Sequence, residues 1–167
     1  MTRSIVEQAH DMYDAVPYEV PVPDGSLYNL LDDAARLYPD RIALDYFGAT
    51  TTYAQVRDQV LKAARVLHEA GVGPGDTVAI ALPNCPQAFV AFYACMRIGA
   101  IAAQHNPLAP ASEIAGQLGR HGGKVAIVWE KCVDAYPLSV LDTVFTVDIS
   151  HDMPASQRLL LRLPVAR

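Results

Sequence analysis

The sequence has little positive charge and few cysteines, and both shortages exclude classes of function. Lysine and arginine number 13, against 18 aspartate and glutamate residues, and the net charge is −5. Because nucleic-acid binding requires clustered Lys and Arg, this balance argues against nucleic acid as the main partner. The three cysteines (Cys85, Cys95 and Cys132) have no metal-ligand spacing and leave an odd number, so we expect reduced thiols in a cytoplasmic protein.

Other features are missing as well, and each absence narrows the range of possible functions. The longest apolar run is about half the length of a membrane-spanning helix, so we expect no transmembrane segment. The first eight residues, MTRSIVEQ, lack the apolar region of a signal peptide. No Gly-x-Ser-x-Gly nucleophile elbow occurs, and the five histidines are scattered along the chain. We therefore predict no catalytic residue and no metal ligand.

The composition that remains is that of a soluble globular domain. The 167 residues are 51% hydrophobic and 19% charged, which suffices for one domain with a real core. We expect residues 1–25 to form a short helix and a proline-rich strap, and residues 26–150 to form an α/β subdomain. Residues 151–167 would begin a linker or a helix that the end of the chain interrupts.

Residues 71–107 carry the clearest structural pattern. Residues 77–82 are an apolar run of strand length with turn residues on both sides, which is typical of a strand in a parallel sheet. Pro86 suits the first turn of a helix, and residues 88–96 are wholly apolar, which predicts a helix buried nearly all round. A second strand begins at residue 101.

Glycines 71, 73 and 75 suggest a phosphate-binding loop by composition only. Such a loop follows a strand and opens a helix, so that helix N–H groups face the anion. Here Gly71 follows a predicted helix and Gly75 precedes a predicted strand, which indicates a turn. The segment Gly122-Gly123-Lys124 also precedes a strand and lacks hydroxyl groups.

The rest of the chain predicts a parallel sheet flanked by helices, together with a small hairpin over residues 42–51. Two further strands are expected at 124–129 and 144–147, with a helix after Pro110 and a short one at 130–136. Three strand–crossover–strand units thus follow one another. They favour a parallel sheet with right-handed crossovers, which is the α/β fold class.

Two helices are expected before this region. Ser26 and Thr52 are good N-cap residues, and the second helix extends to residue 70 with His68 exposed. The inner face of the first helix is predicted from residues at helical spacing: Leu27, Leu30, Leu31, Ala34 and Tyr38. Two i,i+4 charge pairs are expected on the second: Asp58–Lys62 and Arg65–Glu69.

Residues 71–107 also resemble a known family. They read GVGPGDTVAIALPNCPQAFVAFYACMRIGAIAAQHNP. This is similar to the N-terminal region of the adenylate-forming enzymes, and in particular of the fatty-acyl-CoA ligases. The shared elements are Gly75-Asp76, Leu82-Pro83-Asn84, Arg97-Ile98-Gly99-Ala100 and Asn106-Pro107. The resemblance covers residues 26–148 and implies part of the N-terminal domain of an acyl-CoA synthetase-like fold.

The resemblance implies an activity for a longer parent enzyme. Enzymes of this family activate a carboxylic acid, here a fatty acid, with ATP and Mg²⁺, and pass the acyl group to coenzyme A. They hold the β- and γ-phosphates with a Ser/Thr/Gly-rich loop ending in Lys, because charge builds up there during transfer. No such loop occurs in this sequence. We therefore expect the first part of a fatty-acid–CoA ligase, inactive alone and without a bound cofactor.

One candidate ligand site follows from the sheet and the resemblance together. Ligands of open parallel sheets bind beyond the carboxyl ends of the strands. In similar acyl-CoA synthetases, the segment after the second strand lies near the nucleotide part of coenzyme A, which indicates Asn106 and Pro107. The alternative is that these two residues only turn the chain. Cys85 is either an exposed thiol or a packed apolar group, and we favour the second.

Other interpretations stay open. The chain is alternatively a stand-alone binding or dimerisation module of the same fold, without catalysis. An unrelated nucleotide-binding α/β protein is a further alternative, against which the missing phosphate loop counts. A fragment with an uncovered apolar edge should self-associate, for example as a homodimer, whereas an evolved module should be monodisperse. Fatty-acyl-AMP ligases, aryl-acid ligases and peptide-synthetase adenylation domains also remain candidates for the parent.

Overall fold

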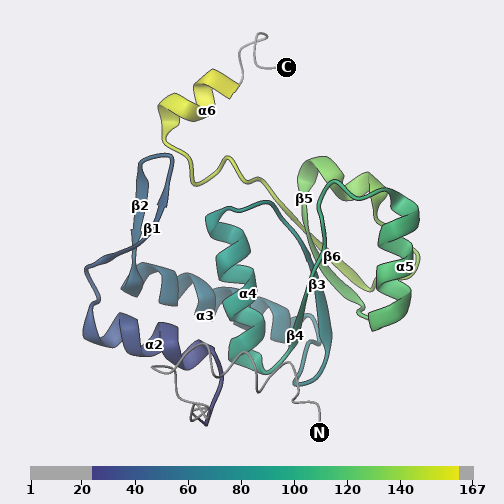
Figure 1. Cartoon of the computed structure of the whole chain (residues 1–167), viewed down its shortest axis with the longest axis horizontal. Helices are drawn as coiled ribbons and strands as arrows, with labels where there is room; N and C mark the ends of the chain where they lie inside the picture. Colours follow the sequence, from purple (N-terminus) through teal and green to yellow (C-terminus); the bar gives the residue numbers. More distant parts are fainter. Residues whose placement is uncertain (1–23, 162–167) are drawn as a thin grey trace, which may run out of the picture.

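Four parallel strands run through the centre of the molecule, with helices on both faces (Figure 1). The computed structural model describes residues 24–161, so the helix and strap predicted before residue 24 lie outside the described residues. The strand order is β4-β3-β5-β6, with the bounds Ile101–Gln104, Thr77–Ala81, Val125–Trp129 and Thr143–Val147. All pairings in this sheet are parallel, which confirms the predicted α/β class.

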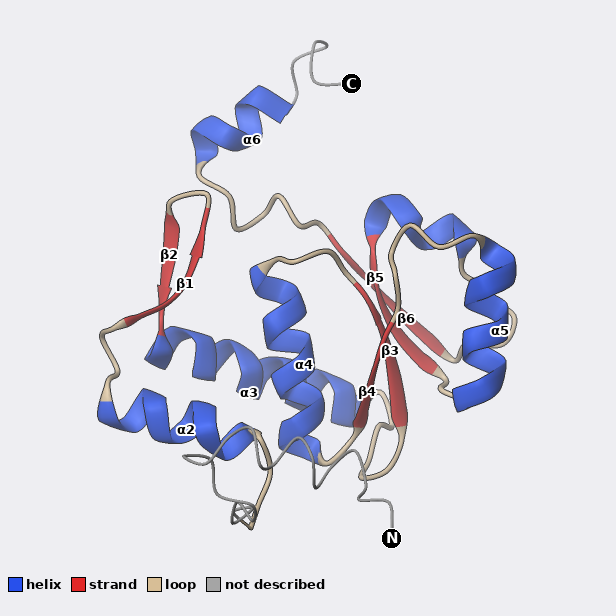
Figure 2. Ribbon diagram, viewed as in Figure 1, coloured by secondary structure: helices blue, strands red, loops and turns tan. Residues whose placement is uncertain are grey.

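Strand β3 lies inside the sheet, and its side chains alternate between two cores. Val78 and Ile80 belong to one core, whereas Ala79 and Ala81 belong to the other. Neighbouring strand residues point to opposite faces, so this register decides which side chain each helix meets. The covering helices are α3 (Tyr53–Glu69) and α4 (Pro86–Ile98) on one face and α5 (Ala111–His121) on the other (Figure 2).

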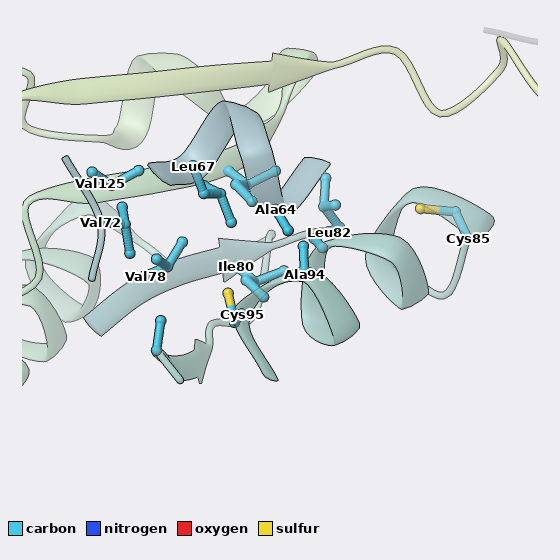
Figure 3. Close-up of a cluster of buried hydrophobic side chains, with 13 residues drawn as sticks. Ala64, Leu67, Val72, Val78, Ile80, Leu82, Cys85, Ala94, Cys95 and Val125 are labelled. Carbon is cyan, nitrogen blue, oxygen red and sulfur yellow. The ribbon is translucent and has the colours of Figure 1, made fainter. Parts of the chain in front are cut away.

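The first core lies between the sheet and helices α3 and α4 (Figure 3). It contains Leu67 of α3, Ala94 and Cys95 of α4, and Ile80 of β3. Helix α4 has Pro86 in its first turn, and every residue from 86 to 96 is buried or half-buried. The prediction of a helix buried nearly all round is therefore confirmed. The physical reason is that α4 also packs against α2 and α3.

The second core lies under α5 and the short 3₁₀ helix η1 (Glu130–Ala135). Ile114 and Leu118 project from α5 and are 0% and 4% exposed. They meet Ala79 and Ala126 of the sheet, whose small side chains let the helix approach closely. The helix expected after Pro110 is confirmed, and Gly122 ends it with a left-handed φ of 67°.

Helix α2 (Tyr28–Leu37) differs from its predicted orientation. Its buried residues are Tyr28, Leu31 and Ala35, which pack toward α3 and α4, while the side chains of Leu27 and Leu30 are 51% and 60% exposed. Two more members of the predicted inner face are not buried, since Ala34 is half-buried and Tyr38 is exposed, and the buried stripe is rotated around the helix. Spacing identified the helix but not which apolar stripe is covered, because α2 has apolar residues on more than one side.

The predicted N-cap of α2 is also wrong. The cap position is Leu27, which makes no side-chain cap bond. Ser26 instead donates a hydrogen bond from Oγ to the carbonyl oxygen of Met96 in α4, at 2.7 Å, and its Oγ accepts one from the N–H of Tyr28. The hydroxyl thus ties the start of α2 to the end of α4, a contact that local sequence does not reveal.

The start of α3 agrees with its prediction. Thr52 Oγ1 accepts a hydrogen bond from the N–H of Gln55, and Gln55 Oε1 accepts one from the N–H of Thr52, at 3.3 and 2.9 Å. This reciprocal pair is a capping box. The charge pair Arg65–Glu69 forms at 2.8 Å, but the expected pair Asp58–Lys62 does not, since Asp58 is 3.9 Å from Arg57. Exposed pairings differ little in free energy, so spacing alone does not select the partner.

The hairpin and the last described helix lie beside the sheet and its covering helices. Strands β1 (Ile42–Tyr46) and β2 (Ala49–Thr52) form the predicted antiparallel hairpin, which turns at Phe47-Gly48 with positive φ at both residues. Helix α6 (Ala155–Leu161) ends in three leucines that are each more than half exposed. In the described part of the chain, no helix combines the length and apolarity needed to cross a membrane.

The burial of β3 leads to a stability prediction. We expect Ile80→Val to lower the free energy of unfolding by about 1 kcal/mol, because it removes a methyl group from a site with no exposed surface. Ile101→Val is the matched control, since Ile101 is 54% exposed on the neighbouring strand β4. Its effect should stay below about 0.5 kcal/mol. Urea unfolding measures both, and equal losses would contradict the interior position of β3.

The capping box leads to a second prediction. Thr52→Ala leaves the N–H of Gln55 without its side-chain acceptor and should lower the free energy of unfolding by about 1 kcal/mol. Thr52→Ser keeps the hydroxyl and should retain most of the stability. Urea unfolding followed by circular dichroism compares the three proteins. If the serine variant is as unstable as the alanine variant, the methyl group rather than the cap stabilises this helix start.

Candidate functional site

The candidate site lies at the carboxyl ends of β3 and β4, where the chain leaves the sheet in two directions. The connection after β3 leads to α4 on one face, and the connection after β4 leads to α5 on the opposite face. Adjacent parallel strands whose connections diverge in this way leave a crevice between their carboxyl ends. The strand order reverses at β3, so an opening is expected at the carboxyl end of this strand.

A cavity of about 480 Å³ occupies this place, closed on one side by the hairpin. Leu82 and Phe89 contribute apolar walls, and Asp45, Asn84 and Gln104 contribute polar groups. Asp45 already accepts a hydrogen bond from the N–H of Gly48, at 2.9 Å. Among the described residues that line the cavity, Asp45 is the only charged one, so the cavity favours neutral or positive groups over phosphate.

Cys85 lies in the wall of this cavity at the N-cap of α4. Its side chain is buried, and burial raises the pKa of the thiol above its ordinary value. A raised pKa reduces the thiolate fraction at neutral pH, and the thiolate is the reactive form. The structure thus agrees with the favoured interpretation of Cys85 as a packed apolar group.

Asn106 and Pro107 follow β4 but do not line this cavity. Asn106 is exposed, and its Oδ1 accepts a hydrogen bond from the N–H of Leu108, at 3.0 Å. Its carbonyl oxygen accepts a second one from the N–H of Ala109, also at 3.0 Å. These bonds form a turn that the side chain of Asn stabilises. A ligand role for the two residues stays a prediction.

The glycine-rich segments lie at the other end of the sheet. Gly71 has a φ of 87° and Gly75 a φ of 84°, and both precede β3. Gly122 and Gly123 directly precede β5 and line one cavity together with Gly71. No helix N-terminus follows either segment, so neither presents the N–H groups that a phosphate loop requires. The interpretation of these glycines as turns is confirmed.

A second open cavity of about 500 Å³ is mostly apolar. It lies between α3, α4 and strand β6, and its wall includes Val66, Val90, Phe145 and Val147. In the described part of the chain, β6 pairs with β5 alone. An apolar groove beside an open strand edge is a surface that another segment or another molecule covers in many proteins.

The structure brings together two of the histidines that are far apart in the sequence. His105, at the end of β4, and His121, at the end of α5, approach to 2.9 Å between their Nε2 atoms. His105 Nδ1 lies 3.2 Å from the hydroxyl oxygen of Tyr136. Sequence reasoning missed this cluster because separations of 16 and 31 residues give no local pattern.

Burial and a neighbouring positive charge both favour the neutral form of the two imidazoles. Burial lowers the pKa of His105 and of His121, and the nearby guanidinium of Arg120 acts in the same direction on both. Burial also raises the pKa of Tyr136 to about 12. Across residues 24–161, no group of three or more His, Cys, Asp and Glu side chains is arranged to hold a metal ion.

Comparison with protein families identifies a relationship over most of the chain. Residues 31–160 match the family model described as AMP-binding enzyme. The chain is 31% identical over 152 residues to the long-chain-fatty-acid–CoA ligase of Bacillus subtilis, covering 89% of this chain and 27% of that protein. It is 42% identical over 88 residues to the acetyl-coenzyme A synthetase of Emericella nidulans, covering 47% of this chain and 13% of that protein.

Solved structures give the same relationship. The N-terminal domain of FACL13 from Mycobacterium tuberculosis superposes with a TM-score of 0.67 at 26% identity, over 75% of this chain and 34% of that one. The N-terminal subdomain of NpsA from Klebsiella oxytoca superposes with a TM-score of 0.66 at 26% identity, over 73% of this chain and 31% of that one. The chain spans about a quarter of the Bacillus ligase. It belongs to the AMP-binding, adenylate-forming enzyme family and corresponds to an N-terminal part of such enzymes.

Proposed function

We propose that this chain is the N-terminal part of a fatty-acid–CoA ligase that works through an acyl-adenylate. In this reaction the carboxylate of the acid attacks the α-phosphate of ATP and pyrophosphate leaves. The thiol of coenzyme A then attacks the acyl carbon and AMP leaves. The observation that carries the proposal is the extent of similarity, which reaches 89% of the chain for the fatty-acid ligase and 47% for the acetyl-coenzyme A synthetase.

The described residues do not fit the phosphates of ATP or its Mg²⁺. The crevice at the carboxyl ends of β3 and β4 is lined by no Lys or Arg among these residues, and it includes the carboxylate of Asp45. Phosphoryl chemistry needs cationic groups or a metal where negative charge develops. We therefore assign no chemical step to this chain. Its part in the proposed enzyme is to supply a rigid sheet and the loops at its carboxyl edge.

Asn106 and Pro107 are our proposed contact with coenzyme A. The side chain of Asn106 is exposed at the carboxyl edge of the sheet, and two backbone N–H groups hold its loop in place. An exposed amide on a fixed turn suits recognition of a polar nucleotide group. A cytoplasmic location is also part of the proposal, supported by the free thiols of Cys85, Cys95 and Cys132.

The reading frame beyond Arg167 tests the proposal most directly. We expect it to continue and to encode a Ser/Thr/Gly-rich segment ending in Lys. The longer protein should release pyrophosphate when given ATP, Mg²⁺ and a long-chain fatty acid, and should form the CoA thioester. The 167-residue chain, tested alongside, should do neither. Faster turnover with acetate or an aryl acid would reject the fatty-acid assignment while keeping the family.

A stop codon after Arg167 would instead favour the alternative, a binding or dimerisation module without catalysis. Size-exclusion chromatography of the 167-residue chain separates the two cases. An excised part, with its apolar groove beside β6 and the exposed leucines 159–161, should self-associate. A single monodisperse species would favour the module.

Substitution of Asn106 tests the coenzyme A contact in the longer protein. Asn106→Asp keeps the oxygen that accepts the Leu108 N–H, so the turn should persist, but its negative charge should repel a phosphate-bearing ligand. We expect the KM for coenzyme A to rise by roughly three- to tenfold, with the KM values for acid and ATP unchanged. Asn29→Asp, on the exposed side of α2, is the control. An unchanged KM for coenzyme A would remove Asn106 from the site.

A further inference from the structure

The contact between His105 and His121 has the geometry of a hydrogen bond rather than of a metal site. The ring centres lie 5.2 Å apart, close to the largest separation that a 2.9 Å contact between the Nε2 atoms permits. The two nitrogens therefore point directly at each other. Metal binding would require both lone pairs to converge on a third point, whereas a linear approach suits one shared proton.

A single backbone group fixes where the protons lie. The N–H of Gly123 donates to Nδ1 of His121 at 3.0 Å, so that nitrogen carries no proton and the proton of the neutral ring is on Nε2. His121 Nε2–H then donates to Nε2 of His105. The proton of His105 is consequently on Nδ1, where it donates to the hydroxyl oxygen of Tyr136 at 3.2 Å.

Each of these three hydrogen bonds, from Gly123 to His121, from His121 to His105 and from His105 to Tyr136, already contains one proton. An additional proton on either ring makes two donors face each other, at the Gly123 amide or between the two Nε2 atoms. The segment around Gly123 has little room to move away and separate two such donors. A Cβ atom at Gly123 would lie 2.6 Å from the carbonyl oxygen of Thr77, which shows how closely this segment packs against β3.

The surroundings also disfavour a positive charge. His105 is only 6% exposed, so a charge on its ring would be poorly solvated. The positive charge of the Arg120 guanidinium on α5 lowers the pKa of both rings further. From the η1 side, the neutral hydroxyl of Tyr136 faces His105, and Cys132 lies close to Tyr136. Among the described residues, no carboxylate is hydrogen-bonded to either imidazole, so nothing compensates an added charge.

We propose that His105, His121 and Tyr136 form an acid-sensitive clamp that joins three separate elements. The clamp connects the loop after β4, the end of α5 and the segment after η1. Protonation of either ring breaks one of its hydrogen bonds and places an unpaired charge in a buried site. The loop that starts at His105 and the turn at Gly122-Gly123 then loosen together.

The direction of the pH effect follows from the lowered pKa values. The folded chain binds these protons less readily than the unfolded chain, in which a histidine pKa is about 6.5. The stabilisation is therefore complete above that pH and is lost as the pH falls through the lower pKa values of the folded state. A raised histidine pKa would give the opposite slope.

Nitrogen-15 NMR of the histidine rings tests the proton arrangement in the 167-residue chain. At pH 8 we expect His121 to carry its proton on Nε2 and His105 on Nδ1. Both rings should protonate below the ordinary histidine pKa of about 6.5. Amide exchange at Leu108, Ala109 and Gly123, corrected for intrinsic rates, should become several-fold faster after protonation. Any other pair of tautomers, or protonation of both rings at the ordinary histidine pKa of about 6.5, would overturn the clamp.

A variant pair provides an independent test by stability. His121→Gln removes one titrating ring and replaces it with an amide that does not titrate, so the urea midpoint should depend less on pH between 7.5 and 5 than in the unchanged chain. His68→Gln is the matched control and should keep the full pH dependence. If His121→Gln retains the full dependence as well, the acid sensitivity arises elsewhere and the proposal fails. The NMR measurement on the unchanged chain decides the question even if the variant does not fold.

Discussion

The register of strand β3 is the constraint on which the rest of the structure depends. This strand has a parallel neighbour on each side, so both of its faces must be covered. Val78 and Ile80 fill the face toward α3 and α4, and Ala79 and Ala81 line the face toward α5. A slip of one residue would place alanines under the large helical layer and branched side chains where α5 needs close approach. The alternation of branched and small residues therefore selects the register of β3 and determines how closely the helices on each face approach the sheet.

The position of the candidate site is a consequence of this arrangement. Because α4 and α5 cover opposite faces, the chain diverges at the carboxyl ends of β3 and β4, and the cavity lies there. The glycine turns collect at the amino ends of β3 and β5, where the chain enters the sheet from helices. The carboxyl edge of the sheet is thus polar but weakly charged, and the glycine-rich turns lie at the opposite edge.

Much of the fold could be predicted from the sequence, because the decisive signals are local. The apolar run of β3, Pro86 at the start of α4 and the Thr52 cap each depend on residues within one element. Contacts between elements were not predictable in this way. Ser26 bonds to Met96 across 70 positions, and the stripe that α2 buries depends on where α3 and α4 lie. The histidine cluster was missed for the same reason, since its members come from the ends of three elements.

His105 takes part both in the local pairing of strands and in the contacts between distant elements. Its backbone N–H donates to the carbonyl oxygen of Ile80 at 2.9 Å, which continues the pairing of β4 with β3, while its ring reaches His121 and Tyr136 on the α5 side. The residue is therefore held from two directions, and Asn106 begins the turn directly after it. Backbone pairing is independent of pH, whereas the ring contacts are not. Acid should thus free the turn from α5 while leaving its attachment to β3, so the loop pivots about the end of the strand and the sheet itself stays intact.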